Sequence, residues 1–427
     1  MKMASTTRSA SWYKEITPYQ WRALFAATLG WVLDSMDVYL FIIAMPLLLR
    51  HFGMTRGMGG FLGSLTLIAS AIGGVAFGWI ADRFGRTKSM MASILIYSVF
   101  TAACGFAQTI TELAVFRFLL GLGVGGEWST GAALISETWP AKHRGKAFGI
   151  MQSGFAVGFA LAAAVAAVVL PRWGWRGAFF VGILPALVTL WLRKHVEEPE
   201  AWLTARAEVV SGHRDAPRVS ALLAPGVRRN VVIASLVSIS AMFAIWGLFS
   251  WLPSMLAQPV AMGGAGLGNK SNLFLIVMNA GSFCGYLGFG LLADRFSRKS
   301  VYLTFLCTAA VAVALYASTR NLTVLFLAGP IVGFFGAGHV AGFGAITGEL
   351  FPLNIRATAQ GFTYNIGRGV SALAPLAIGR VADLYGFTRA FYFTAGAYVV
   401  TAFFVALFPA APGKSARESE FQEVQAA

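Results

Sequence analysis

The sequence predicts an all-α protein that crosses a membrane many times. Of its 427 residues, 57% are hydrophobic and only 12% are charged, whereas soluble globular proteins carry about 25% charged residues. Apolar runs recur along the chain, and most are close to or above the length of about 20 residues that one bilayer crossing needs. These two observations exclude a soluble globular protein.

Cutting the chain at loops with charges, proline and glycine gives twelve candidate helices in two groups of six. The first six cover roughly residues 21–46, 57–81, 88–107, 112–137, 146–170 and 177–193. The second six cover roughly residues 230–256, 272–293, 300–318, 323–349, 359–380 and 388–409. We therefore expect an N-terminal segment (1–20), a first bundle (21–193), a central loop (194–229), a second bundle (230–409) and a tail (410–427).

Basic residues gather in the short loops between the apolar runs. The loop after the second span carries Arg83, Arg86 and Lys88, and the loop after the fourth carries Lys142 and Arg144. Loops rich in lysine and arginine stay in the cytoplasm, so both termini and the central loop are expected there, with the protein in the inner membrane. The net charge of +15 then reflects membrane orientation, and we expect no nucleic-acid partner.

The two groups of helices are predicted to be repeats of one another. The stretch from Gly78 to Arg86 (GWIADRFGR) recurs 212 residues later from Gly290 to Arg298 (GLLADRFSR). The same offset relates Glu137 to Glu349 and Arg144 to Arg356. Because each half has an even number of spans, the halves share one orientation, as parallel repeats about an axis along the membrane normal do.

These motifs resemble those of the major facilitator superfamily, and the resemblance covers nearly the whole chain. The stretch at 78–86 looks like the family's loop motif between its second and third helices, and the pattern RxxxGxGxG that begins at Arg117 looks like its fourth-helix pattern. The resemblance implies two six-helix bundles that rock around a central site and expose it to each side of the membrane in turn.

The resemblance also implies a gate between the bundles, built from charged residues of the loop motif and of its repeat. An alternative is that these charges only orient the protein in the membrane. The gating candidates are Asp82, Arg83, Arg86, Glu137, Arg144, Asp294, Arg295, Arg298, Glu349 and Arg356.

Two further motifs are similar to the proton-coupled organic-acid branches of that superfamily, which include sialate, lactate and aromatic-acid symporters. One is Asp34-x-x-Asp37 in the first span, and the other is Asn365-x-Gly-Arg368 in the eleventh. One residue departs from the pattern, because Ser35 stands where many members have glycine after the first aspartate.

Asp34 and Asp37 are the candidates for proton coupling. A charge at the centre of a membrane helix costs about 2.5 to 3.5 kcal/mol, and residues three apart share one helix face. Two neighbouring carboxylates in surroundings of low dielectric constant cannot both be ionised without a large free-energy cost. The pair is therefore suited to carrying a proton. The alternative is that one or both aspartates form a permanent ion pair with Arg117, which we expect at a similar depth in the membrane. An arginine that switches between an aspartate and the substrate anion would combine ion pairing with proton coupling.

Arg368 is the candidate for binding a substrate anion, because a guanidinium can hold a carboxylate through two parallel hydrogen bonds. Tyr364 and Asn365 precede it by four and three residues, so the three are expected to share one helix face. The alternative is a structural ion pair of Arg368 with Glu349 or Asp383.

The repeat gives further candidates for the wall of the binding site. Subtracting 212 from Arg368 gives Ala156, so the fold itself does not require an arginine there, and the neighbouring Gln152 becomes a binding candidate. Trp128 and Tyr39 are expected to form aromatic walls, with lipid-facing or core packing as the alternative.

Glu127 in the fourth span maps by the same offset onto His339 in the tenth. Both are therefore expected near the bundle interface at comparable depth. Either could take part in proton coupling, because histidine titrates near neutral pH and intramembrane ionisable groups are commonly functional. The alternative is a hydrogen-bonded pair that only packs helices.

The sequence therefore predicts a monomeric transporter that moves a small carboxylate with protons across the bilayer, with protons as the coupling ion and no other cofactor. Histidine and cysteine are too sparse for a metal site, no phosphate-binding Gly-Lys-Ser/Thr motif indicates ATP-driven transport, and nothing indicates an enzyme. A neutral-sugar symporter of the same fold and a membrane sensor that binds a metabolite without moving it remain the alternatives.

Overall fold

A computed structural model describes residues 12–54, 56–211, 219–260 and 263–409. The expected N-terminal segment is therefore described only from Trp12 onward, and the expected tail at 410–427 lies outside the described residues. All regular elements in the described ranges are helices.

The first half and the central segment contain seven α-helices. These are α1 (Pro18–Phe52), α2 (Arg56–Phe84), α3 (Arg86–Cys104), α4 (Ile110–Thr138), α5 (Arg144–Val181), α6 (Pro185–His195) and α7 (Glu200–Val210). The second half contains α8 (Pro225–Ala257), α9 (Ser271–Arg295), α10 (Arg298–Ser318), α11 (Leu322–Gly338), α12 (Val340–Leu350), α13 (Arg356–Val370) and α14 (Ala374–Ala406).

Helix α1 begins and ends at residues that suit these positions. The Thr17 hydroxyl accepts a hydrogen bond from the backbone N–H of Gln20, and the Gln20 side chain accepts one from the backbone N–H of Thr17. This reciprocal cap satisfies two N–H groups that lack a partner in the first helical turn. Gly53 ends the helix at φ 63°, a left-handed conformation that glycine adopts without steric cost.

Ten helical stretches in the described ranges are long and apolar enough to cross a membrane. Two of them, Ala141–Thr189 and Leu353–Ala406, have 49 and 54 residues, more than twice the length of about 20 residues that one crossing needs. Each is broken at a glycine with positive φ, Gly174 (61°) in one and Gly386 (83°) in the other. Counting each as two spans gives the twelve that the sequence predicts.

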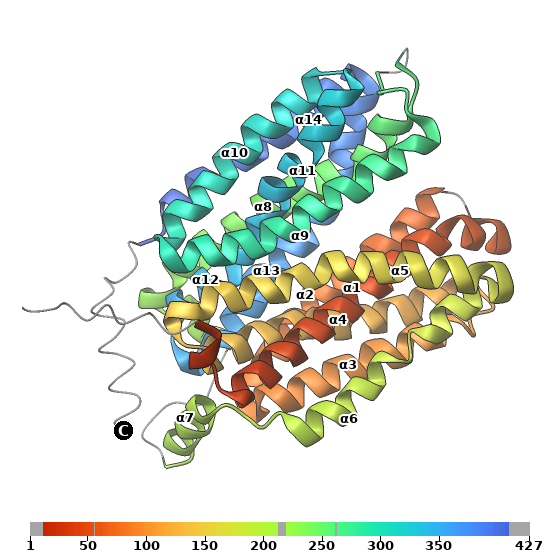
Figure 1. The fold of residues 1–427 in the computed structure, drawn as a ribbon. Coiled ribbons are helices and arrows are strands. Elements are labelled where there is room, and N and C mark those ends of the chain that lie inside the picture. Colours follow the sequence, from red (N-terminus) through yellow and green to blue (C-terminus); the bar gives the residue numbers. More distant parts are fainter. Residues whose placement is uncertain (1–11, 55, 212–218, 261–262, 410–427) are drawn as a thin grey trace, which may run out of the picture.

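The twelve spans form two six-helix bundles that lie side by side (Figure 1). The first bundle runs from red to yellow-green in the figure, and the second from green to blue. Helix α2 of the first bundle packs on α13 of the second, and α5 packs on α9. The offset of 212 relates these two contacts to one another, so the bundle interface has the predicted repeat symmetry.

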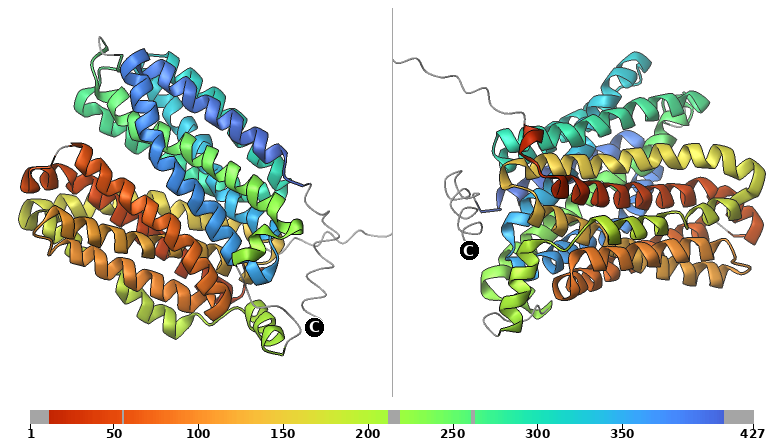
Figure 2. Two further views of the ribbon diagram at one scale, coloured as in Figure 1. Left: turned by 180° about the vertical axis from the view of Figure 1, so that it is seen from behind. Right: turned by 60° about the horizontal axis from the view of Figure 1, so that its bottom comes forward.

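The two bundles are joined at one end and diverge toward the other. They meet at the end that carries α7, and both the view in Figure 1 and the reverse view in Figure 2 show the ribbons separating away from it. The hydrogen bonds of the two loop motifs described below lie at the joined end, so the site between the bundles is shut off there.

Glycines allow neighbouring helices within each bundle to approach closely. A Cβ atom on Gly73 of α2 would lie 2.0 Å from the carbonyl oxygen of Leu122 in α4. In the second half, a Cβ on Gly285 of α9 would lie 2.1 Å from the carbonyl oxygen of Phe334 in α11. Both residues of the first contact map onto the second by adding 212, so the repeat preserves this close approach.

Replacing Gly73 with alanine should destabilise the protein. The added methyl group would meet backbone atoms that cannot rotate away, and overpacking of this kind costs about 1–3 kcal/mol. Gly60→Ala in the same helix is the matched control, because a Cβ at Gly60 meets no atom within 4 Å. The thermal unfolding midpoint in detergent should fall for Gly73→Ala and not for Gly60→Ala; equal midpoints would contradict this account of the packing.

Candidate functional site

The loop motif after α2 forms a latch between the bundles. The Asp82 carboxylate accepts hydrogen bonds from the backbone N–H of Thr358 at 2.8 Å, from its hydroxyl at 2.5 Å, and from the backbone N–H of Ala357 at 3.3 Å. These groups are in the first turn of α13, where the helix dipole also stabilises a negative charge. Arg86 holds the carboxylate in place, with Nη2 2.9 Å from Asp82 Oδ1.

The repeat of this motif forms a second latch, in which the second bundle supplies the carboxylate and the first bundle supplies the helix N-terminus. The Asp294 carboxylate accepts hydrogen bonds from the backbone N–H groups of Gly145 (2.8 Å) and Lys146 (2.9 Å) in the first turn of α5, and from Nζ of Lys146 at 3.0 Å. Gly145 and Lys146 map onto Ala357 and Thr358 by the offset of 212. Each bundle therefore supplies one carboxylate and receives the other at a helix N-terminus.

Two glutamates complete the ion pairs of the latches. Glu137 accepts two hydrogen bonds from the guanidinium of Arg86, at 2.9 and 2.6 Å, and Glu349 accepts one from Arg298 at 2.5 Å. Arg298 lies 3.9 Å from Asp294 and also donates to the carbonyl oxygen of Ala141 in the other bundle at 2.5 Å. Each glutamate thus holds one arginine beside one latch carboxylate: Glu137 holds Arg86 beside Asp82, and Glu349 holds Arg298 beside Asp294.

The other gating candidates occupy different positions. Arg144 donates to the carbonyl oxygen of Trp139 at 3.4 Å, and Arg356 donates to that of Phe351 at 3.3 Å, so both contact the chain just after a helix end. Arg83 and Arg295 are exposed and lie over rings of their own bundle, 5.4 Å from Trp79 and 5.8 Å from Phe296. The structure therefore does not bring Arg83 and Arg295 into the latches.

The central segment contributes a residue that the sequence reading missed. The Glu198 carboxylate accepts hydrogen bonds from the backbone N–H groups of Arg86 (2.6 Å), Thr87 (3.2 Å) and Lys88 (3.1 Å), at the N-terminus of α3. Trp202 of α7 donates from Nε1 to the backbone oxygen of Asp82 at 3.0 Å. The acidic residues at 197–200 were visible in the sequence as a possible sign of such a role. That Glu198 caps the N-terminus of α3 could be seen only in the folded structure.

The N-terminal segment is tied to the second latch. Glu15, at the end of a short 3₁₀ helix (Trp12–Glu15), pairs with Nζ of Lys142 and lies 3.0 Å from Nε2 of His143. Hydrogen bonds with Lys142 and then His143 lower the pKa of Glu15 to about 2. His143 in turn lies 3.4 Å from Nζ of Lys146, so this contact extends to the residue that holds Asp294.

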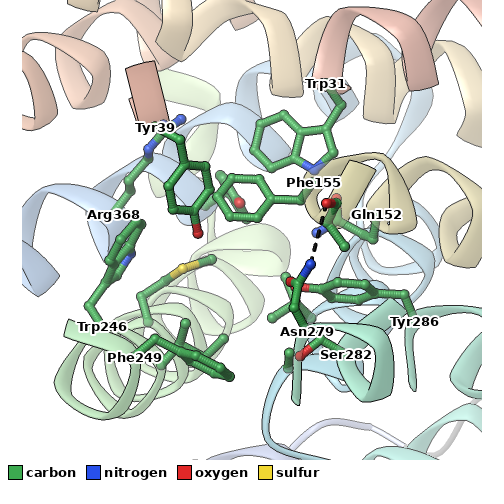
Figure 3. Close-up of a pocket in the computed structure, with 16 residues that line it drawn as sticks. Trp31, Tyr39, Gln152, Phe155, Trp246, Phe249, Asn279, Ser282, Tyr286 and Arg368 are labelled. Atoms are coloured by element: carbon green, nitrogen blue, oxygen red, sulfur yellow. Dashed lines mark hydrogen bonds between the residues drawn. The ribbon is translucent and has the colours of Figure 1, made fainter. Parts of the chain in front are cut away.

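A cavity lies between the bundles, and Figure 3 shows its lining side chains. The wall is largely aromatic and comes from both halves of the chain. The first bundle supplies Trp31, Tyr39, Gln152, Phe155 and Ala156. The second bundle supplies Met242, Ile245, Trp246, Phe249, Asn279, Ser282, Tyr286, Ala337, Val340, Tyr364 and Arg368.

Arg368 is the cationic residue of this lining, and behind it lies Asp34. Nη2 of Arg368 is 3.7 Å from Oδ2 of Asp34, close enough for charge attraction and too long for a good hydrogen bond. Both Asp34 oxygens and Nη1 of Arg368 have no hydrogen-bond partner among the described residues, although both side chains are buried. Arg368 therefore pairs with neither Glu349 nor Asp383, the two structural partners considered from sequence.

Asp37 forms a separate and better-bonded cluster inside the first bundle. Its Oδ2 lies 3.7 Å from Nη1 of Arg117, and its Oδ1 accepts a hydrogen bond from Thr101 at 2.8 Å. Arg117 also donates to the hydroxyl of Thr66 at 3.1 Å, and its guanidinium lies 3.8 Å from the centre of the Phe41 ring. Of the two aspartates, Asp37 therefore pairs with Arg117, while Asp34 faces Arg368.

Glu127 and His339 do not form a hydrogen-bonded pair. Glu127 is buried against α1, where its side chain occupies the space beside Gly30, and neither carboxylate oxygen has a partner among the described residues. His339 lies inside the second bundle between two rings, 5.8 Å from Tyr302 and 5.5 Å from Tyr398. Glu127 thus lies near the aspartates, whereas His339 is not part of the cavity lining.

The remaining binding candidates divide between the cavity wall and the layer behind it. Tyr364 and Gln152 line the cavity, and they are related by the offset of 212. Trp128 lies behind them, stacked on Tyr364 with ring centres 3.6 Å apart and donating to Gln152 at 3.2 Å. Tyr39 lines the cavity as expected.

Asn365 lies outside the cavity lining, although it was expected to share a face with Arg368. Its amide donates to the backbone oxygen of Gly125 in the other bundle at 3.3 Å and lies 3.4 Å from the hydroxyl of Ser129. The side chain fits there because Gly74 has no Cβ, which would lie 2.0 Å from the Asn365 amide nitrogen. Asn365 is therefore a contact between the bundles.

Three polar residues of the wall went unrecognised in the sequence. Asn279, Ser282 and Tyr286 occur on α9 at a spacing of three and four residues, which places them on one helix face. Asn279 also donates a long hydrogen bond (3.5 Å) to the backbone oxygen of Ala156 in the other bundle, drawn as the dashed line in Figure 3. That spacing within an apolar span was the available signal.

Two membrane-embedded bundles around a cavity, closed at one end by paired latches, define a membrane transporter. The sequence matches the family description "Major Facilitator Superfamily" over residues 27–288 and 270–427. The chain belongs to this family.

Relatives with known names align with nearly the full chain. The "Probable 4-methylmuconolactone transporter" of Cupriavidus pinatubonensis is 35% identical, and the alignment covers 94% of each chain. The cis,cis-muconate transport protein of Acinetobacter baylyi is 30% identical, covering 92% of this chain and 95% of the relative. Among solved structures, the proton:xylose symporter XylE has a TM-score of 0.75 at 19% identity, covering 91% of this chain and 96% of that one, which supports the fold.

Neutralising a latch carboxylate should loosen the joined end. Asp82→Asn removes the charge that α13 binds, and hydrogen bonds to charged groups contribute about 1.5–3 kcal/mol. In a background without native cysteines, the reactivity of Ser136→Cys toward a thiol reagent should rise about 10- to 100-fold, because Ser136 is buried there beside Gln360 of the other bundle.

The exposed Asp383 provides the control for this measurement. Asp383→Asn should leave the labelling rate of the cysteine at position 136 unchanged, and Asp294→Asn should raise it as Asp82→Asn does. A labelling rate that responds to neither latch variant would show that the two carboxylates do not hold the bundles together.

Proposed function

We propose that the protein is a proton-coupled symporter of a small organic acid with a planar ring or conjugated chain. The observation that carries this proposal is Arg368, whose buried guanidinium on the cavity wall has a donor without a partner. A buried donor of this kind is costly unless an acceptor arrives, and a carboxylate can accept two parallel hydrogen bonds from arginine.

The wall around Arg368 suits a flat acid. Trp31, Trp246 and Tyr364 are among the rings that line the cavity, and aromatic faces pack well against planar ligands. Relatives named for muconate, benzoate, gentisate and niacin transport support this substrate class. The chemistry needed is thus one carboxylate for Arg368 and an apolar body for the rings.

The contact between Asp34 and Arg368 provides the coupling. With Asp34 ionised, the pair is neutral; when a substrate carboxylate joins Arg368, the cavity gains one negative charge. A proton on Asp34 restores neutrality. Because an uncompensated charge in the membrane interior costs several kcal/mol, the bundles close over the substrate only when Asp34 is protonated, and they close without substrate when Asp34 and Arg368 neutralise one another.

The latches complete the transport cycle. In this proposal their basic loops face the cytoplasm, the described conformation is shut on that side, and the site opens to the outside. Rocking of the bundles would break the two latches and release acid and proton inward. Both latches and the cavity lie within one chain, so the monomer is the proposed transport unit.

Asp34→Asn and Asp37→Asn should each abolish accumulation of acid driven by a proton gradient. Asparagine at position 34 keeps the shape of the side chain but cannot take up and release the proton. Asparagine at position 37 leaves the charge of Arg117 uncompensated, and a lone positive charge one helical turn from Asp34 opposes protonation of Asp34. The measurement is uptake of labelled benzoate, cis,cis-muconate, lactate and sialate into proteoliposomes with an acidic exterior. Accumulation against a concentration gradient in both variants would rule out this role for the aspartates.

Arg368→Lys should weaken substrate binding although the positive charge remains. Lysine cannot form the two parallel hydrogen bonds, and a loss of about 1.5–3 kcal/mol corresponds to a roughly 10- to 100-fold higher KM. Arg380→Lys is the matched control, because Arg380 is exposed on α14. Comparing each acid with its amide and with neutral sugars tests the substrate class: equal competition by the amides or by sugars would exclude anion recognition.

A further inference from the structure

The cavity wall carries a second group of polar side chains besides Arg368. Gln152 of α5 and Asn279 and Tyr286 of α9 line the same cavity, and we call these three residues the neutral site. Figure 3 shows the neutral site on one side of the cavity and Arg368 on the other. None of the three side chains carries a charge, and the transport cycle proposed above gives them no role.

Contacts between α5 and α9 bring the three residues of the neutral site together. A Cβ atom on Gly149 of α5 would lie 2.7 Å from the backbone oxygen of Tyr286. One to two turns further along α5, the backbone oxygen of Ala156 accepts a hydrogen bond from Asn279 at 3.5 Å. The two helices are therefore antiparallel along this contact. Gln152 lies on the same face of α5 between these two levels, so it lies beside α9 between Asn279 and Tyr286.

The repeat places the neutral site and Arg368 at one depth on opposite sides of the cavity. Arg368 and Ala156 are equivalent positions, because 212 residues separate them. Parallel repeats are related by an axis along the membrane normal, so equivalent positions lie at the same depth across that axis. Asn279 donates to the backbone oxygen of Ala156 and therefore lies at the depth of Arg368. A ligand that contacts both would lie across the cavity, parallel to the membrane plane.

The fold does not require polar residues at positions 279 and 286. In the equivalent contact of α2 with α13, the position that corresponds to Asn279 holds Leu67. The position that corresponds to Tyr286 holds Gly74. An apolar or a small residue thus suits the same packing. Because polar groups away from water are costly unless they are hydrogen-bonded, the amide and the phenol on α9 indicate a site that binds a polar group.

The neutral site has hydrogen-bonding groups that the protein itself does not use. Trp128 can only donate, so its bond to Gln152 at 3.2 Å fixes the amide oxygen as the acceptor and leaves the amide nitrogen as a free donor. Asn279 uses one N–H on Ala156, which leaves its second N–H and its oxygen without a partner among the described residues. The neutral site can therefore both donate to and accept from an oxygen group of a ligand.

We propose that the neutral site binds an uncharged oxygen substituent, a hydroxyl or a carbonyl, at the end of the acid that is far from its carboxylate; this inference rests on the proposed transport of an organic acid. The carboxylate binds Arg368, the planar body lies between the rings of the wall, and the far oxygen binds Gln152 and Asn279. Arg368 is the cation of this lining. A second carboxylate at the neutral site would have no positive partner there, so it binds less well than a hydroxyl.

Asn279→Leu tests the neutral site, because leucine is the residue that the repeat has in the equivalent contact. Asn230→Leu is the matched control. Asn230 also donates to a backbone oxygen at 3.5 Å, that of Leu350, and it does not line the cavity. The measurement is the KM for uptake of labelled 4-hydroxybenzoate, 4-methylbenzoate, terephthalate and cis,cis-muconate by the full-length protein in proteoliposomes with an acidic exterior. The hydroxyl and methyl groups are similar in size, and only the hydroxyl can form hydrogen bonds.

The wild-type protein should have a KM for 4-hydroxybenzoate about 3- to 10-fold lower than for 4-methylbenzoate, the ratio that one net hydrogen bond gives. Asn279→Leu should bring this ratio close to one, and Asn230→Leu should leave it as in the wild type. Terephthalate should have a higher KM than 4-hydroxybenzoate in the wild type. A ratio of two KM values from one preparation does not depend on how much of the variant is folded.

Other results overturn either this inference or the proposed function. A wild type that takes up none of the four acids overturns the proposed function and the neutral site with it. Uptake with equal KM values for 4-hydroxybenzoate and 4-methylbenzoate overturns the neutral site alone, as does a preference that Asn279→Leu retains or that Asn230→Leu loses. A lower KM for terephthalate than for 4-hydroxybenzoate, or uptake of cis,cis-muconate alone, would show that the far end of the cavity takes a second carboxylate instead of an uncharged oxygen.

Discussion

The structure depends on how charges are compensated where water is scarce. Asp34 and Arg368 come from different bundles and approach to 3.7 Å without a hydrogen bond. Such a pair is held by charge attraction alone, and the proposed cycle requires that Arg368 exchange Asp34 for a substrate carboxylate. Asp37 and Arg117, by contrast, are each held by a threonine. The protein thus combines an ion pair inside one bundle, whose two members are each anchored by a threonine, with an ion pair between the bundles that has no such anchor among the described residues.

The main contacts that join the two bundles occur twice, once in each half of the repeat. The latch carboxylates, the helix N-termini that they cap and the close contact of Gly73 with Leu122 all recur at an offset of 212. The two halves differ in the charged residues of their membrane spans. Asp34 and Asp37 correspond to Trp246 and Phe249, and Arg368 corresponds to Ala156. In the proposed cycle, the contacts that break and re-form lie at positions related by the repeat, whereas the proton and the substrate bind at positions where the halves differ.

The sequence was sufficient for the fold, because apolar length and a constant offset are properties of the chain itself. It also indicated Asp34 and Arg368, since charges inside apolar spans are conspicuous. It could not place Asn365, whose position depends on the space left by Gly74, nor Glu198, whose partners are backbone groups of a distant helix.

The two latches have a further consequence. Each joins a carboxylate of one half to the N-terminus of a helix in the other half, in both directions. An interface in which the same surface meets its own copy is the kind that pairs identical subunits around a two-fold axis. Each half therefore carries a self-complementary surface, as expected of a chain that arose when a gene for a pairing six-helix protein was duplicated and joined end to end.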